Sequence, residues 1–501
     1  MKRLPFLIVG GLLTASAVFH VVRAQTPAAP APATSAAPAD PFVKNPADPK
    51  AATANDLWVD CFTIFEVYAL DKHDALSVIE GERGGAARYR RVTELAKAGK
   101  ARLTTLTALT TKSGQRAVVE DIDEVRFPTE FMPPAGNQGL AFPTAWETRN
   151  AGDTLELEPV VANDGQTVDI NLVPQHVSLF AFRDEQARAV DAAISQPIFH
   201  TQKLTTSITA YNGEPLFLGT YTPPANNPED PKATETWLAF LRADMQGPTA
   251  QELKAVARPP APGNQLQLEY SIYSVERNAA HDLLAAPLPV GGAWEKLQPL
   301  IKGNQARFEH LTTLFVKSGQ RSLAEEIREE RYWTELTPGG RPSAIETTTR
   351  TVTAGPSEDL TKPNQKRDYS KNTTTTEHTS VSREIPDAPP TPGWVTAFET
   401  RNVGTTVEVE PVVGPDGVTI DINHVVSQTT LLGKLKAPGI AEKYPWQPLF
   451  ETRKLTSAQS ILLGVHTFIG TLNPPGEDGV NDRVDSGRTW LLFLRATPCE
   501  K

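Results

Sequence analysis

Histidines and paired carboxylates are the residues of this chain whose chemistry would support acid–base catalysis or metal binding. The sequence holds nine histidines, but none of them falls in a His-Glu-x-x-His pattern. No Gly-x-Ser-x-Gly, Cys-x-x-Cys or glycine-rich phosphate loop occurs either. The sequence therefore predicts no catalytic residues, no metal ligands and no cofactor, and it indicates a protein that is not an enzyme.

Two His-Asp pairs stand just before apolar stretches with helical spacing: His73-Asp74 and His281-Asp282. An acidic side chain at a helix start commonly accepts a hydrogen bond from an unpaired backbone N–H group. We therefore expect Asp74 and Asp282 to cap helices, in preference to the alternative of a metal-binding or catalytic pair.

Two acidic pairs, Glu156/Glu158 and Glu408/Glu410, have the residue types of a general acid and base. Within each pair the residues are two positions apart, and alternate residues of a strand point to the same face of a sheet. We therefore expect each pair to belong to a solvated polar strand face rather than to a catalytic site.

These carboxylates belong to two nearly identical stretches, Ala145–Asn171 and Ala397–Asn423, in which 18 of 27 positions agree. Such agreement indicates an internal duplication. In each stretch, alternating aliphatic and polar residues flank an Asp-Gly turn, a pattern typical of a β-hairpin. The Glu-Thr-Arg-Asn run that both stretches contain, at 147–150 and 399–402, is interpreted as charge alternation on a strand edge.

The other parts of the two copies align in the same order. Phe62–Leu76 aligns over Tyr270–Leu284 at an offset of 208 residues, which places His73 over His281. Apolar residues at three-to-four spacing predict a helix over Ala86–Ala98 and an equivalent helix in the second copy. Each helix is followed by a strand that ends in Lys-Ser-Gly-Gln-Arg, where we expect the glycine to take the positive φ of a tight turn.

The Lys-Ser-Gly-Gln-Arg runs lie 205 residues apart, whereas all later motifs lie 251 to 253 residues apart. This jump places an insertion of about 47 residues in the second copy, within 337–392. The inserted segment is rich in Thr and Pro and partly alternating. It is either an extended hairpin arm or a disordered loop.

The composition is ordinary for a globular protein, with 39% hydrophobic and 22% charged residues among 501. The net charge of -10 argues against nucleic acid and anionic membrane surfaces as partners. The N-terminus has the basic end and apolar run of a secretory signal peptide, with an uncleaved anchor as the alternative. Cys61 and Cys499 are expected to be two unpaired thiols rather than a disulfide.

The expected fold class is β-rich α+β, with two tandem repeats that each combine a helical segment and antiparallel hairpins. The expected organisation is a signal peptide at 1–24, an Ala/Pro-rich linker at 25–56, a first repeat at 57–246, a Pro-rich linker at 247–264, and a second repeat at 265–501 with the insertion at 337–392.

The ordered motifs resemble the secretin domain. They run from a helix to T-x-K-S-G-Q-R-A, then F-E-T-R-N-x-G-x-T-x-E-V-E-P, then D-G-x-T-I-D-I-N, then Q-P-x-F-x-T-R-K-x-T-T-S. The resemblance covers about 57–243 and 266–496. Secretins are outer-membrane channel proteins of type II and type III secretion systems and type IV pili. The resemblance implies a homo-oligomeric ring in which each subunit adds strands to a shared barrel, with Thr405–Val426 as a segment of its wall.

The resemblance also implies a non-enzymatic function in protein export, together with other secretion-system proteins. It implies an exported location, in the outer membrane or periplasm of a diderm bacterium. Two departures favour an alternative. The family usually has one such domain, and its V-P-x-L-G-D-I-P-x-L-G segment is missing here. The alternative is a soluble periplasmic or surface scaffold without a pore, and an exported enzyme remains as a third hypothesis.

Overall fold

The structure is a computed structural model of the chain. It describes residues 59–132, 142–162, 165–186, 193–223, 230–247, 265–337, 343–354, 373–384, 394–435, 447–474 and 487–499. The predicted signal peptide, the Ala/Pro-rich linker and nearly all of the Pro-rich linker lie outside these residues. Below, the first half means the described residues of 59–247 and the second half those of 265–499.

The first half follows the predicted order of one strand, two helices and a series of strands. Its elements are β1 (Asp60–Asp71), α1 (Lys72–Gly81), α2 (Gly85–Lys97), β2 (Ala101–Lys112), β3 (Ala117–Met132), β4 (Phe142–Val161), β5 (Thr167–Gln186), β6 (Ala193–Lys203), β7 (Thr206–Tyr211), β8 (Leu216–Tyr221), the short 3-10 helix η2 (Pro231–Thr234) and β9 (Glu235–Gln246).

The second half repeats that order with two changes among its described residues: β13 and β14 are added, and the single strand β17 stands in place of β6 and β7, with no counterpart of the 3-10 helix. Its elements are β10 (Gln265–Glu276), α4 (Arg277–Leu284), α5 (Gly292–Lys302), β11 (Arg307–Lys317), β12 (Ser322–Thr337), β13 (Ser343–Ala354), β14 (Thr373–Glu384), β15 (Trp394–Val413), β16 (Thr419–Leu435), β17 (Gln447–Leu462), β18 (Thr467–Leu472) and β19 (Arg488–Pro498). The protein is strand-rich with antiparallel sheets, which confirms the β-rich class with antiparallel hairpins that the sequence predicts.

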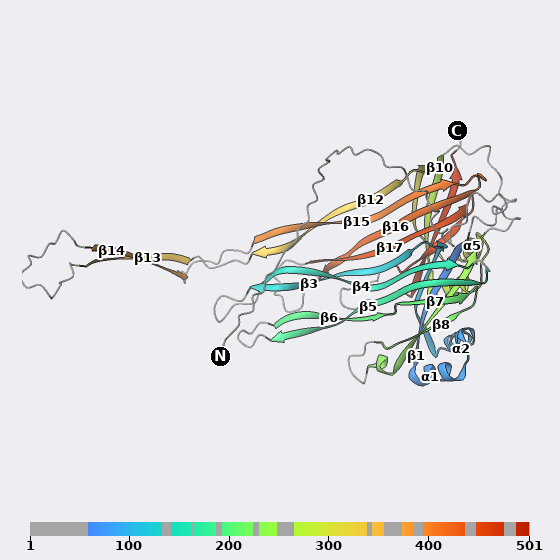
Figure 1. The fold of residues 1–501 in the computed structure, drawn as a ribbon, viewed down its shortest axis with the longest axis horizontal. Coiled ribbons are helices and arrows are strands. Elements are labelled where there is room, and N and C mark those ends of the chain that lie inside the picture. The colour runs from blue at the N-terminus through green and yellow to red at the C-terminus, as the bar shows by residue number, and fades with distance from the viewer. Residues whose placement is uncertain are drawn as a thin grey trace, which may run out of the picture. The chain divides into compact units, whose positions relative to one another are not determined.

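Both halves contribute strands to the same two large sheets (Figure 1). Among the described residues, an eight-stranded sheet has the order β11-β10-β19-β18-β2-β1-β9-β8. A nine-stranded sheet has the order β12-β15-β16-β17-β3-β4-β5-β6, with β7 also paired to β5. The two halves therefore meet where β18 pairs with β2 and where β17 pairs with β3.

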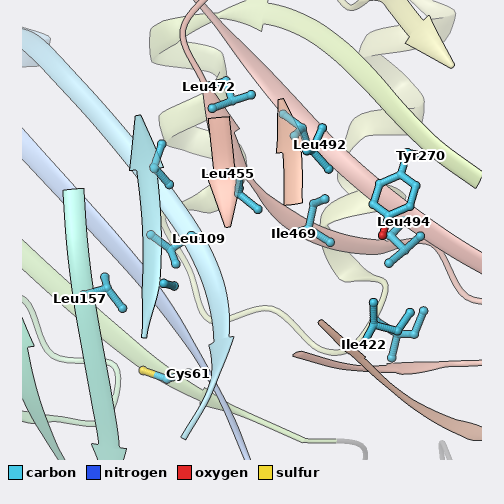
Figure 2. Packing of buried hydrophobic residues seen from close by; sticks show 14 of the residues in the cluster. Cys61, Leu109, Leu157, Tyr270, Ile422, Leu455, Ile469, Leu472, Leu492 and Leu494 are labelled. Carbon is cyan, nitrogen blue, oxygen red and sulfur yellow. The ribbon is translucent and has the colours of Figure 1, made fainter. Parts of the chain in front are cut away.

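The main core lies between these two sheets. Leu109 of β2 and Leu494 of β19 come from the eight-stranded sheet, and Ile422 of β16 comes from the nine-stranded one; all three belong to one buried cluster (Figure 2). The helices cover the other face of the eight-stranded sheet, where Val78 of α1, Leu283 of α4 and Leu238 of β9 belong to a second buried cluster. Alternate side chains of the central strands thus enter different cores, so these strands are buried on both faces.

The strand pairs of the two halves have matching registers. In β3–β4, Ala117 is opposite Leu157, and in β12–β15, Ser322 is opposite Val409. Both pairs also carry a bulge at the same place, between Pro128 and Glu130 in the first half and between Trp333 and Glu335 in the second. These matches support the interpretation of two tandem copies, which remains a prediction from the sequence.

The alignment that places His73 over His281 is wrong. Cys61 lies opposite Thr111 in β1–β2, and Leu266 lies opposite Val316 in β10–β11. The true offset in these strands is therefore the same as that between the two Lys-Ser-Gly-Gln-Arg runs, and at this offset the counterpart of His281 is Leu76. The alignment from the sequence matched a recurring His-Asp dipeptide, which carries no information about backbone pairing.

The predicted helix caps are also wrong. Asp71 caps α1, because its carboxylate accepts a hydrogen bond from the backbone N–H of His73 at 2.8 Å. Glu276 caps α4 by accepting from the N–H of Ala279 at 3.0 Å. Asp74 and Asp282 lie inside these helices, because each helix begins before the His-Asp pair.

The predicted hairpins and turns are confirmed. Strands β4 and β5 pair with Pro159 opposite Ile170, and β15 and β16 pair in the equivalent register. Leu157 is buried while the neighbouring Glu158 is exposed, as the alternation predicts. The glycines of the two Lys-Ser-Gly-Gln-Arg turns, Gly114 and Gly319, have φ of 76° and 73°.

Two predictions that the sequence left open now have an outcome. The insertion contains a hairpin, because β13 and β14 pair from Ser343–Glu384 to Ala354–Thr373 as a two-stranded sheet of their own. Cys61 is a buried free thiol and Cys499 is a partly exposed one.

A glycine allows two strands to approach closely in each half. Gly404 of β15 has a φ of 135°, and a Cβ atom there would lie 1.9 Å from the carbonyl oxygen of Glu326 in β12. We expect Gly404→Ala to lower the free energy of unfolding by more than about 1 kcal/mol. Backbone strain alone costs about 1–3 kcal/mol, and the steric clash adds to it. Urea unfolding of the purified protein would measure this loss.

Gly81→Ala is the control for that substitution. Gly81 ends α1, and a Cβ atom there would meet no atom within 4 Å. We expect its stability to stay within about 1 kcal/mol of the parent, since alanine restricts the unfolded chain and meets no clash in the folded one. Equal losses for the two variants would contradict the close approach of β12 and β15.

Candidate assembly surface

The contact between β17 and β3 joins the two halves in the nine-stranded sheet. The strands pair from Thr456↔Val118 to Phe450↔Glu124. Lys454 and Glu120 lie opposite each other in this register, with 3.3 Å between the ammonium nitrogen and a carboxylate oxygen. We call the contacts that join the two halves the inner junction: β17 with β3, β18 with β2, and α4 over β1.

A polar network crosses this junction. Arg126 of β3 donates to Glu399 of β15 at 3.1 Å and to the hydroxyl of Tyr332 in β12 at 3.0 Å. Its guanidinium also lies over the Tyr332 ring, 4.1 Å from the ring centroid. Arg401 of β15 pairs with Glu124 of β3. The nine-stranded sheet is therefore curled, since residues of β15 reach β3 although two strands separate them in the sheet order.

The interpretation of the Glu-Thr-Arg-Asn runs as charge alternation on a strand edge fits the pairing of the described residues. At 399–402 β15 pairs with β12 alone, because its pairing with β16 begins at Gly404, and at 147–150 β4 pairs with β3 alone, because its pairing with β5 begins at Gly152. Glu399 and Arg401 act in the inner junction, whereas Glu147 and Arg149 of β4 are exposed. Local alternation cannot show which strand of a curled sheet a side chain will face.

In the eight-stranded sheet, β18 and β2 form the second contact of the inner junction. Gly470 lies opposite Leu109. The hydroxyl of Thr471 accepts from the backbone N–H of Ala108 at 2.8 Å, and Ser457 donates to the carbonyl oxygen of Thr110 at 2.5 Å. A Cβ atom on Gly470 would lie 2.2 Å from Leu455, so the absence of a side chain lets β17 and β18 pack closely here.

Helix α4 completes the inner junction by placing His281 over β1. Its Nε2 atom lies 3.2 Å from a carboxylate oxygen of Glu66, 3.2 Å from the Tyr68 hydroxyl and 3.1 Å from the Tyr89 hydroxyl. Burial raises the pKa of the Glu66 carboxyl, while the charge of His281 and a hydrogen bond from Tyr89 oppose that rise. The group joins a helix of the second half to a strand and a helix of the first.

This pKa shift makes stability depend on pH. A carboxyl group with a higher pKa in the folded than in the unfolded protein binds its proton more tightly when folded. Its contribution to stability is therefore greatest below its ordinary pKa of 4.5 and declines as the pH rises from there through the raised value. We expect Glu66→Gln to reduce this decline.

The measurement is the free energy of unfolding of both proteins between about pH 4 and 8. This range begins near the ordinary carboxyl pKa and extends through the values to which burial raises a carboxyl pKa. The difference between Glu66→Gln and the parent should shift in favour of the variant as the pH rises. Parallel pH profiles would contradict a raised pKa at Glu66.

Each sheet also ends in strands with an open side. Within the described part of the chain, β11 pairs only with β10, and β12 pairs with β15 apart from the single pair Glu335↔Ala145. At the opposite end of the sheets, β8 pairs only with β9 and β6 only with β5. We call β11 and β12 the leading edge, and β6, β8 and the adjoining α1 the trailing edge.

Large apolar side chains are exposed along the leading edge: Phe308 57%, Leu311 45%, Phe315 72%, Leu323 54% and Ile327 38%. The residues of β2 that correspond to the first two, Leu103 and Leu106, are only 9% and 1% exposed. The difference has a plain cause, since the second half packs on this side of β2, whereas the described residues leave the same side of β11 open; the other side of β11 is buried through Leu314 and Val316. A strand edge with exposed apolar side chains is typical of an interaction surface.

Clusters of metal ligands and membrane-spanning helices are two other features that would indicate a functional site. No group of three or more His, Cys, Asp or Glu side chains among them is arranged to hold a metal ion. None of the helices described here combines the length and apolar character needed to cross a membrane. The strand edges are the candidate functional site, because they combine unpaired strand sides with exposed apolar side chains.

A comparison with protein families gives this surface a context. Residues 94–227 match the family model described as "Secretin: Bacterial type II and III secretion system protein". The chain carries a secretin domain. The match begins in α2 and extends past β8, so it includes the trailing-edge strands. The second half lies outside it, and its assignment as another secretin domain remains a prediction.

Solved secretin structures also show similarity, at low identity. The chain is 9% identical to a chain of the Klebsiella pneumoniae type II secretion system outer membrane complex of PulD, PulS and PulC HR domain, covering 39% of this chain and 40% of that one, with a TM-score of 0.19. It is 12% identical to the type II secretin GspD of enteropathogenic Escherichia coli, covering 40% and 69% of the two chains at a TM-score of 0.18.

A third similar structure is the Salmonella SPI-1 type III secretion injectisome secretin InvG, at 13% identity, 39% and 66% coverage and a TM-score of 0.19. This chain spans only 40% of the Klebsiella chain. At these TM-scores the likenesses carry no argument, so the secretin assignment depends on the family match. No curated protein sequence matches this chain.

The sequence patterns predict the hairpins but not the residues that join the two halves. Glu124 and Arg126 of β3 stand in no predicted motif, although Glu329 and Arg331 occupy the corresponding places of the second half. That recurrence was the available indication. It becomes visible only at the correct offset.

Proposed function

We propose that the protein is a non-enzymatic, secretin-like component of a bacterial protein secretion machinery, and that it works as a homo-oligomer. The family match over residues 94–227 carries this proposal, since secretins are structural components of type II and III secretion systems. The open strand edges support the homo-oligomer, because an exposed edge is a template for pairing with another chain.

The proposal includes an exported location in the outer membrane or periplasm of a diderm bacterium. The predicted signal peptide at 1–24 supports export. We also propose other secretion-system proteins as partners; the Klebsiella complex, for example, contains PulS and PulC beside PulD. A type IV pilus machinery is included, because secretins also belong to such systems.

The test is to express the full chain with its own leader in a diderm bacterium. Membranes are fractionated, and the detergent extract is run in SDS with and without heating. We expect heat-sensitive multimers in the outer-membrane fraction and ring-shaped particles by electron microscopy. A protein that stays monomeric and outside the outer-membrane fraction would refute the proposal.

A soluble periplasmic or surface scaffold is the second candidate. The acidic net charge of -10 and the missing late family segment favour it. In that case the same experiment would find the protein in the soluble periplasmic fraction or on the cell surface, and SDS would dissociate it completely without heating.

A further inference from the structure

We propose that the chain binds a second copy of itself head to tail, with the trailing edge of one chain against the leading edge of the next. The contact between chains would repeat the inner junction, strand for strand. This inference rests on the proposed homo-oligomer and names the residues that join its subunits.

The two edges are the counterparts of the strands that form the inner junction. Strands β17 and β18 of the second half correspond to β6 and β8 of the first, and β3 and β2 correspond to β12 and β11. Within one chain, the second half binds the first through β17–β3 and β18–β2. The same contact between chains requires β6 to pair with β12 and β8 to pair with β11. Such a contact is heterologous, and it generates a ring when its rotation closes.

The charges at the two edges fit the register of the inner junction. The ion pair Lys454–Glu120 of β17–β3 corresponds to Lys203 on β6 and Glu325 on β12. Both of these side chains are exposed, and they have the same charges as their counterparts. Head-to-tail pairing in this register would bring Lys203 of one chain opposite Glu325 of the next.

The polar network of the inner junction also has a complete second set of residues. Its four charged members are Arg126, Glu124, Glu399 and Arg401, and the corresponding residues are Arg331, Glu329, Glu147 and Arg149. Residue type is the same at all four positions. The side chain of Arg126 is 9% exposed, whereas that of Arg331 is 75% exposed. The second set therefore has the right charges and lacks the burial that a neighbouring chain would supply.

The helices give an independent indication. Between the two halves, the helix residue changes from polar to apolar, and the surface that it would meet changes in the same way. His281 of α4 lies on the polar group of Glu66, Tyr68 and Tyr89 in the inner junction. Its counterpart on α1 is Leu76, an apolar residue that is 51% exposed. The surface that Leu76 would meet is apolar as well: Tyr273, the counterpart of Tyr68, packs against the exposed Phe308 with 5.3 Å between ring centroids.

At the place of Glu66 the second half has Ser271, so no buried carboxylate would be left without a histidine. A polar helix residue thus faces a polar surface inside the chain, and an apolar one would face an apolar surface between chains. Burial of these exposed apolar side chains would favour association.

The contacts that β12 already makes with the first half, at Tyr332, Trp333 and Glu335, leave room for this pairing. The inner junction uses β3 only as far as Glu124, which corresponds to Glu329 on β12. The pair Glu335↔Ala145 lies beyond that point. Strand β12 can therefore touch β4 of its own chain at Glu335 and still accept β6 of the next chain along Leu323–Glu329.

Disulfide cross-linking in the assembled protein tests the register. Lys203→Cys and Glu325→Cys are combined in one full-length chain that also carries Cys499→Ser; the remaining Cys61 is fully buried. Opposite positions of paired strands are close enough for a disulfide. We expect mild oxidation of outer-membrane extracts to give a ladder of covalent multimers in SDS after heating, which a thiol reductant reverses.

Two further variants are controls. Lys454→Cys with Glu120→Cys should form a disulfide within each chain and give no ladder. Lys203→Cys with Glu329→Cys moves one cysteine four residues along β12, roughly 13 Å, and should not cross-link. All the positions changed in the test variant are exposed or partly exposed, so folding should be preserved.

The outcomes separate this inference from the proposed function. A ladder from the Lys203/Glu325 pair alone supports head-to-tail pairing in the stated register. Ring particles without that ladder, or with a ladder from the displaced control instead, would overturn the inference while leaving the homo-oligomer intact. A protein that forms no multimers at all would overturn both.

Discussion

Leu106→Ala should cost about 2–5 kcal/mol of unfolding free energy, as for other fully buried leucines, whereas Leu311→Ala should cost less than about 0.5 kcal/mol in the monomer. The two leucines occupy equivalent positions of the two halves, on β2 and β11. Leu106 is 1% exposed and Leu311 is 45% exposed, because only β2 is covered by the other half. The same substitution therefore leaves a cavity at one position and removes surface at the other.

Urea unfolding of the two variants under monomeric conditions would measure this difference. Both substitutions remove the same atoms from a strand, so strand propensity cancels in the comparison. Similar losses for both variants would mean that the inner junction does not bury β2. In the assembled protein the order should change, and Leu311→Ala should then weaken the multimer as well.

Arg126→Met should lower the free energy of unfolding by about 1.5–3 kcal/mol, the usual loss for hydrogen bonds to charged groups. Arg126 donates to Glu399 and to Tyr332, and its guanidinium lies over the Tyr332 ring. Methionine keeps much of the side-chain volume, so the loss reports mainly on the polar contacts. The expected loss is moderate because Glu399 remains 59% exposed and can be solvated when its partner is removed.

Arg331→Met is the matched control, since Arg331 occupies the equivalent position on β12 and is 75% exposed. Its effect on the monomer should stay within about 0.5 kcal/mol. Thermal unfolding of both variants in the same buffer would provide the comparison. If Arg331→Met proved as costly as Arg126→Met, the leading edge would already be engaged within the monomer.

The local elements of this fold are predictable from the sequence. Period-two alternation and an Asp-Gly turn identify the β4–β5 and β15–β16 hairpins, because strand pairing across a tight turn depends on neighbouring residues. The glycines of the two Lys-Ser-Gly-Gln-Arg turns are predictable for the same reason: positive φ at Gly114 and Gly319 is a local requirement.

The inner junction could not be predicted in this way. The pairing of β17 with β3 joins strands from opposite halves of the chain, and alternation in either strand is compatible with many partners. The role of His281 depends on three side chains of the other half, none of which is near it in sequence. The misplaced offset at His73 has a related cause, since residue identity in a short stretch is weaker evidence than the register of a whole strand.

The covalent link between the two halves constrains the stoichiometry of any closed ring. Every chain would supply two consecutive sectors, so the total number of sectors would always be even. Contacts within one chain and contacts between chains would alternate around the ring. The contacts within a chain are rich in ion pairs, whereas those between chains would be apolar at the helices. Loss of a single polypeptide would then open a double-width gap, and growth or repair of the ring would proceed in steps of two.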